Sequence, residues 1–202
     1  SASTMSPLHD ACIDGDTERV RQLLDEGAPV DEKDEYLNSR TALMWASLHG
    51  RTEVVQLLLA KGAAVDEKDE YGDTTLILAS RNGHTKVVRL LLDKGAAVDV
   101  KDEWGRTALM WASHKGHTEV VQLLFDKGAA VDLKSEIGYT ALMLASRYGG
   151  GVAAARQWRG GRREGQGRQD RAHVREPAGP RGGGAAAARQ GRGGRREGQG
   201  RQ

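Results

Sequence analysis

The side chains that could support catalysis or bind a metal are few, and they are spread along the chain. Cys12 is the only cysteine, so no intrachain disulfide can form, and a reducing compartment fits this composition. His114 and His117 are three residues apart, but Lys115 and Gly116 separate them and no Cys or carboxylate cluster completes a metal site. Cys12 also lacks a histidine partner that would mark it as a nucleophile. The sequence therefore predicts a protein without catalytic residues, without a metal and without a cofactor.

Two runs of sequence Asp-Glu-Lys-Asp-Glu, at residues 31–35 and 66–70, bring carboxylates together. They lack the spacing and the glycine of a calcium-binding loop. Charged side chains at the edge of an extended segment also keep it from pairing with other chains. We therefore interpret both runs as charged edges of extended segments.

The elements that carry these residues recur at a fixed period. Threonines are spaced 33 residues apart from position 41 to position 140, and glycines are spaced in the same way from 62 to 128. A fixed period of this length indicates an array of stacked repeats, in which each repeat contacts only its neighbours. The threonines are Thr41, Thr74, Thr107 and Thr140.

One repeat, Trp104–Glu136, shows how each unit is expected to fold. Thr107 can cap a first helix, which Lys115-Gly116 ends. A second helix starts near Thr118 and carries an apolar stripe at helical spacing. Gly128 follows as the residue that can adopt the left-handed conformation at a helix end. An extended segment and a turn complete the unit, and only stacking of several copies can bury its apolar face.

This unit resembles the ankyrin repeat, whose pattern is roughly G-x-T-P-L-H-x-A-A-x-x-G-H-x-x-V-V-x-L-L-L-x-x-G-A. In this chain Gly105–Leu109 opens the pattern, Gly116-His117 and Val120-Val121 continue it, and Gly128-Ala129 closes it. The resemblance covers Met5–Gly149, with four nearly full copies and a fifth that is cut short. It implies an all-α repeat solenoid, a stack of helix-turn-helix units with β-hairpin fingers. It implies less about function, because the family hosts many functions.

The predicted domain organisation has two parts. Residues 1–149 form the repeat array, and residues 150–202 form a disordered tail rich in Arg, Gly and Ala. The joint between repeats one and two is two residues longer than the others, so the first finger is expected to contain an insertion near residues 36–38. The repeats are predicted at about 5–36, 37–70, 71–103, 104–136 and 137–149.

The two parts differ in charge. Residues 1–149 contain 17 Lys and Arg against 24 Asp and Glu, whereas residues 150–202 contain 13 Arg against 4 Asp and Glu. The acidic array favours a partner with basic patches, and the basic tail would bind nucleic acid without sequence specificity. The sequence GRREGQGRQ occurs twice in the tail, also 33 residues apart. We hypothesise that the tail is a frame-shifted continuation of the array, or a sequencing or gene-model error of the same form. Codons for residues 161–180, with their third bases chosen freely and read one nucleotide later, can encode the ankyrin-like string VDEKDKDGKTALMYASRQGH.

Positions that vary between repeats, while the surrounding frame is kept, are expected to face solvent or a partner. They lie at the finger tips, two residues after the tips, and at the end of the first helix. Aromatic tips flanked by arginine have the composition of a binding hot spot, although they could instead pack only on the next finger. The predicted partner-binding residues are Tyr36, Arg40, Tyr71, Asp73, Arg81, Asn82, Trp104, Arg106, His114, Lys115 and Tyr139.

The sequence thus favours a non-enzymatic scaffold that binds a protein partner through the concave face of fingers and first helices. Two alternatives remain open: non-specific nucleic-acid binding by residues 150–202, or a non-functional fragment of a longer ankyrin protein. No apolar run approaches the ~18 residues of a membrane span, and the expected location is intracellular, cytoplasmic or nuclear. The chain is expected to be a monomer that is prone to associate at its C-terminal end, because repeat five lacks a proper second helix.

Overall fold

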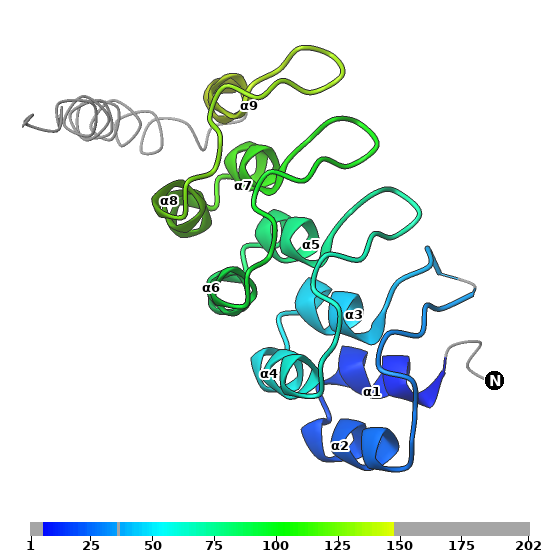
Figure 1. Cartoon of the computed structure of the whole chain (residues 1–202). Coiled ribbons are helices and arrows are strands. Elements are labelled where there is room, and N and C mark those ends of the chain that lie inside the picture. Colours follow the sequence, from blue (N-terminus) through cyan, green and yellow to red (C-terminus); the bar gives the residue numbers. More distant parts are fainter. Residues whose placement is uncertain (1–5, 36, 148–202) are drawn as a thin grey trace, which may run out of the picture. The chain divides into compact units, whose positions relative to one another are not determined.

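The computed structural model describes residues 6–35 and 37–147. Nine α-helices lie in this part of the chain and form the predicted all-α stack (Figure 1). The described residues belong to the first of the two units into which the chain divides, residues 1–164. The predicted tail, its boundary at residue 149 and its proposed origin lie outside the described residues.

Helices pair within each repeat, and the pairs stack in sequence order. Repeat one contains α1 (Pro7–Asp14) and α2 (Thr17–Asp25), and repeat two contains α3 (Ala42–Leu48) and α4 (Thr52–Ala60). Repeat three contains α5 (Thr75–Arg81) and α6 (Thr85–Asp93), and repeat four contains α7 (Ala108–Lys115) and α8 (Thr118–Asp126). The described part of repeat five contains α9 (Ala141–Arg147). The first helices contact one another in one row and the second helices in another row (Figure 1).

The helix ends follow the local sequence signals. Each periodic threonine accepts the backbone N–H three residues later, at 3.3 or 3.4 Å from its Oγ1. This bond satisfies one of the donors that a helix N-terminus leaves free. Gly128 follows α8 with a φ of +86°, as predicted. Since these signals recur in each repeat, the helix pairs form at the same period as the sequence.

The core lies between the two rows of helices. The face of α7 that carries small and apolar residues is buried, and Ala108, Leu109, Ala112 and Ser113 are each at most 1% exposed. The predicted stripe of α8 is also buried, with Val120 and Leu124 among its members. The core extends without interruption from Leu8 to Ala145, because each apolar face packs on the next repeat.

The fingers are hairpins closed by few hydrogen bonds. Two isolated antiparallel bridges occur in the described residues, Lys33 with Thr41 and Lys68 with Thr74. In the first finger the predicted insertion places Asn38 and Ser39 at positive φ. Asparagine tolerates this region better than most residues, because its side chain can bond to the local backbone.

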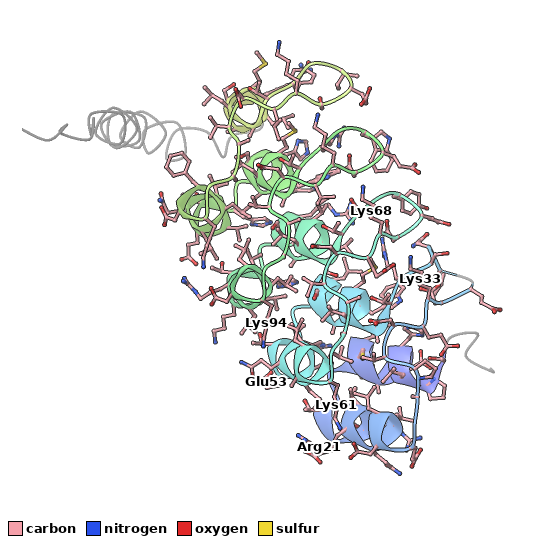
Figure 2. The ribbon with its side chains drawn as sticks, in the orientation of Figure 1. Arg21, Lys33, Glu53, Lys61, Lys68 and Lys94 are labelled. Atoms are coloured by element: carbon pink, nitrogen blue, oxygen red, sulfur yellow. The ribbon has the colours of Figure 1, made fainter. Side chains whose placement is uncertain are left out.

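Repeated bonds join each finger to the next. Lys33, Lys68 and Lys101 each donate from Nζ to a lysine carbonyl of the following repeat, at 2.9 or 3.0 Å. Figure 2 shows Lys33 and Lys68 on neighbouring fingers. Asp31 and Asp66 accept backbone N–H groups of the following repeat through Oδ1, at 2.8 and 3.0 Å. Most residues of the two acidic runs lie at the surface of the fingers, and the runs also link neighbouring repeats.

The described part of the array ends with an apolar surface on α9. Met143 is 50% exposed, and Leu142 is half-buried. Association through this surface remains a prediction. Among residues 6–35 and 37–147, no helix has the length and hydrophobicity needed to cross a membrane.

Candidate protein-binding face

The finger tips carry most of the exposed large apolar side chains of the described residues. The described residues include five exposed large apolar side chains, and all of them except Met143 lie at a finger tip. We call these four residues the tip row: Leu37, Tyr71, Trp104 and Ile137, which are 41%, 37%, 44% and 69% exposed. A row of exposed apolar side chains of this size is typical of an interaction surface.

The tips are held in place by their neighbours. In three joints, a backbone N–H beside one tip donates to a carbonyl at the previous tip, at 3.0 Å. The rings of Tyr71 and Trp104 stack, with centroids 6.0 Å apart and an interplanar angle of 20°. The tip aromatics thus pack on the next finger and remain accessible, so the two interpretations of the sequence are compatible.

A buried aspartate shapes the third finger, whose tip is Trp104. Asp102 is 6% exposed. Its Oδ1 accepts the backbone N–H groups of Trp104 at 2.9 Å and Arg106 at 2.8 Å. Its Oδ2 accepts the indole N–H of Trp111, on α7, at 2.8 Å. One carboxylate therefore fixes the turn below the tip and attaches the finger to the first helix.

The side chain that donates to the second oxygen of this aspartate differs between repeats. It depends on whether tryptophan or leucine stands at the equivalent position of the first helix. In repeat two, Trp45 donates its indole N–H to Asp34 at 3.0 Å, as Trp111 does to Asp102. In repeat three, Leu78 stands at the tryptophan position. The Oδ2 of Asp69 instead accepts from Nε of Arg40, on the previous finger, at 2.9 Å.

At α9 and the finger before it, both positions differ from those of repeats two and four, whereas repeat three differs only at the tryptophan. Leu144 replaces the tryptophan and Ser135 replaces the aspartate. Ser135 Oγ accepts the N–H of Tyr139 at 3.2 Å, so the finger turn is still capped. A hydroxyl offers no second oxygen, and no charge, to a side chain of the previous repeat.

A basic and aromatic cluster lies below the tips of repeats three and four. The guanidinium carbons of Arg81 and Arg106 lie 5.1 and 4.6 Å from the ring centroid of Trp111. The His114 ring contacts Trp111 edge-on, with centroids 6.0 Å apart. Burial, together with the charges of Lys115 and Arg106, lowers the pKa of His114. We call this group the Trp111 cluster: Arg81, Arg106, Trp111, His114 and Lys115.

Asp73 neutralises one of these cations. Its Oδ2 accepts from Nη1 of Arg81 at 2.8 Å, and its Oδ1 has no hydrogen-bond partner. Asp73 is fully buried. Burial raises the pKa of Asp73 to about 6, against the opposing effect of the Arg81 charge.

We expect the free energy of unfolding of the wild type, relative to that of Asp73→Asn, to fall as the pH rises from about 4 to about 6. In this window the unfolded chain loses a proton that folded Asp73 keeps, so deprotonation favours the unfolded state. A pKa difference of about two units corresponds to roughly 3 kcal/mol. Urea denaturation of both proteins over this pH range measures the effect, and a difference that grew in favour of the wild type would contradict the assignment.

The structure corrects the predicted binding set at two positions. Arg40 and Asp73 are 7% and 0% exposed, because each is paired with a charged side chain of the array. Tyr139 is half-buried and accepts a bond from Arg147 through its hydroxyl, at 2.9 Å. Tyr36 lies outside the described residues. The remaining predicted residues are exposed or half-buried: Tyr71, Arg81, Asn82, Trp104, Arg106, His114 and Lys115.

Sequence analysis missed Leu37 and Trp111 as parts of this face. Leu37 lies within the insertion of the first finger, where the 33-residue period does not align it with a position of the other repeats. Trp111 is half-buried and is accessible beside the cations that flank it. A signal for its role exists, because an arginine occurs five residues before a tryptophan at 40 and 45 and again at 106 and 111. This pairing is absent from repeats three and five.

No other chemistry emerges from the described residues. Cys12 is buried, and burial raises the pKa of its thiol to about 12, so it is no nucleophile at neutral pH. No group of three or more His, Cys, Asp and Glu side chains is placed to hold a metal within residues 6–35 and 37–147. His84 and His117 bond through Nε2 to backbone carbonyls of the previous repeat, at 3.0 and 3.1 Å, which supports a structural role for them.

The stacked helix pairs define a helical-repeat protein, and its finger tips carry exposed apolar side chains. A family profile described as "Ankyrin repeats (3 copies)" matches residues 8–102 and 94–156. These matches span more than half of the 202 residues, and the chain belongs to the ankyrin-repeat family. A search of curated proteins found no match. Ankyrin repeats generally mediate protein–protein interactions and are usually non-catalytic, and proteins that contain them are commonly intracellular.

Proposed function

We propose that this chain is a non-enzymatic, intracellular scaffold that binds a protein partner along its tip row. The observation that carries this proposal is the concentration of exposed large apolar side chains at the finger tips. Covering them would remove apolar surface from water, which is the main favourable contribution to most protein–protein association. Tyr71 and Trp104 are of the residue types that most often dominate interface energies.

The packing of the tips supports the same conclusion. The stack of Tyr71 on Trp104 and the backbone bonds between fingers hold these rings before a partner arrives. A surface ordered in advance loses less side-chain freedom on binding, so more of the contact energy remains as affinity. The basic tail, the basis of the nucleic-acid alternative, lies outside the described residues, and deletion of residues 150–202 separates that activity from partner binding.

We expect Trp104→Ala to weaken partner binding by at least about thirtyfold, which corresponds to about 2 kcal/mol at an interface hot spot. The partner is first isolated by cross-linking in cells with the full chain, and its affinity is then measured by calorimetry. Met143→Ala serves as the control, because Met143 is an exposed large apolar residue that is not at a tip. Equal affinities for Trp104→Ala and the wild type, with both proteins folded, would rule out the tip row as the main binding surface.

A further inference from the structure

Arg40 and Arg106 occupy the same position in repeats two and four but have different surroundings. Both lie over the ring of a tryptophan, with the guanidinium carbon 5.1 Å from the centroid of Trp45 and 4.6 Å from that of Trp111. Arg40 also forms an ion pair of 2.9 Å with the carboxylate of Asp69. Arg106 has no ion-pair partner within residues 6–35 and 37–147, so its charge is not neutralised there.

The difference between the two arginines follows from the next finger. Asp69 lies 29 residues after Arg40, and Ser135 lies 29 residues after Arg106, since 135 − 106 = 29. Leucine stands at the tryptophan position in both following repeats, at 78 and 144, so neither offers an indole N–H. An aspartate at position 135 would therefore have one carboxylate oxygen free to accept from Arg106, as Oδ2 of Asp69 accepts from Arg40. Serine removes both that oxygen and the charge.

Within residues 6–35 and 37–147, no carboxylate near Arg106 forms an ion pair with its guanidinium. Arg81 is already paired with Asp73, and Asp102 directs Oδ2 to the indole of Trp111. Lys115 is exposed and close enough for its charge to act on His114. The base of the third finger thus has a guanidinium without an ion pair, although the array as a whole is acidic.

We propose that Arg106, stacked on Trp111 at the base of the third finger, binds a carboxylate side chain of the protein partner. This inference rests on the proposed function and names the chemistry of the partner at one position of the same face. Arg40 provides the precedent within the molecule, since the same arginine–tryptophan arrangement binds the carboxylate of Asp69. Arg106 is half-buried, so an approaching carboxylate meets a partly desolvated guanidinium, where a charge-assisted hydrogen bond is stronger than in water.

The test uses the full chain, labelled with nitrogen-15, and two synthetic decapeptides. One peptide alternates Glu with Leu, and the other alternates Lys with Leu. We expect the acidic peptide, and not the basic one, to shift the indole resonance of Trp111, which a Trp111→Phe spectrum assigns. Ser135→Asp supplies the missing carboxylate and is expected to weaken binding of the acidic peptide by about tenfold or more. Arg106→Gln is expected to do the same.

Ser146→Asp is the matched control, because it adds the same charge at an exposed position of α9. It should leave the affinity within about twofold of the wild type. The inference is overturned if Ser135→Asp and Ser146→Asp bind the acidic peptide equally well, or if only the indole of Trp158, in the tail, shifts. Partner binding that is lost in Trp104→Ala and retained in both Ser135→Asp and Arg106→Gln would support the tip row and overturn the carboxylate site alone.

Discussion

Asp102→Ala is expected to lower the free energy of unfolding by about 3–5 kcal/mol, because it leaves three donors without their acceptor. These donors are the backbone N–H groups of Trp104 and Arg106 and the indole N–H of Trp111, at 2.8–2.9 Å. The carboxylate is buried, so water cannot replace it fully without opening the base of the finger. The substitution should also disorder the third finger, and with it the Trp104 tip. Urea denaturation measures the first effect, and amide exchange of residues 103–106 measures the second.

Repeat five supplies two controls for this prediction. Ser135→Ala removes one bond of 3.2 Å at the equivalent position and is expected to cost only about 1 kcal/mol. The double variant Asp102→Ser, Trp111→Leu recreates the pair found in repeat five, where no indole donor needs an acceptor. Its cost should be smaller than the sum of the costs of its two single substitutions. A strictly additive result would show that the aspartate and the tryptophan are not coupled.

Gly50→Ala is expected to destabilise the protein by about 2–4 kcal/mol, through a strained backbone and a clash. Gly50 has a φ of +68°, and a Cβ atom there would lie 2.5 Å from Nδ1 of His84. The imidazole cannot move away freely, since its Nε2 bonds to the carbonyl of Leu48 at 3.0 Å. The substitution would therefore weaken the joint between repeats two and three. Thermal or urea unfolding of the full chain measures the loss.

Gly62→Ala isolates the backbone contribution. Gly62 has a φ of +87°, and a Cβ atom there would meet nothing within 4 Å. Its substitution should cost about 1–2 kcal/mol from the left-handed conformation alone. In a His84→Ala background, the additional cost of Gly50→Ala should fall to that of Gly62→Ala. An unchanged additional cost in that background would show that the ring contact contributes nothing.

The fold could be predicted from the sequence because its signals are local and recur at one period. Thr107 caps α7, and Gly128 takes the left-handed conformation after α8, each within a few residues of the element it ends. The tip aromatics were also predictable, since Tyr71 and Trp104 vary within a constant frame and remain exposed. Their contact with one another depends on stacking and was left open by the sequence.

The finger charges show where the sequence was insufficient. Asp34 and Asp69 belong to the Asp-Glu-Lys-Asp-Glu runs, which suggested solvated edges, yet both are buried. Net charge was a coarser guide, because it favours a basic partner without showing that Arg106, in the third finger, has no ion-pair partner among the described residues. Composition adds all charges together, whereas burial and ion pairing remove some of them from the surface.

The sequence by itself determined the repeat period, the helix ends and the positions of the tips, because each depends on residues that are neighbours in the chain. Only the tertiary structure decided which variable residues are accessible. Arg40 is buried and paired, whereas the equivalent Arg106 is half-buried and without an ion-pair partner among the described residues. The residue 29 positions later in the chain causes this difference. It is Asp69 for Arg40 and Ser135 for Arg106. Stacking brings these residues together, and the free energy of a charge depends on the groups that stacking places beside it.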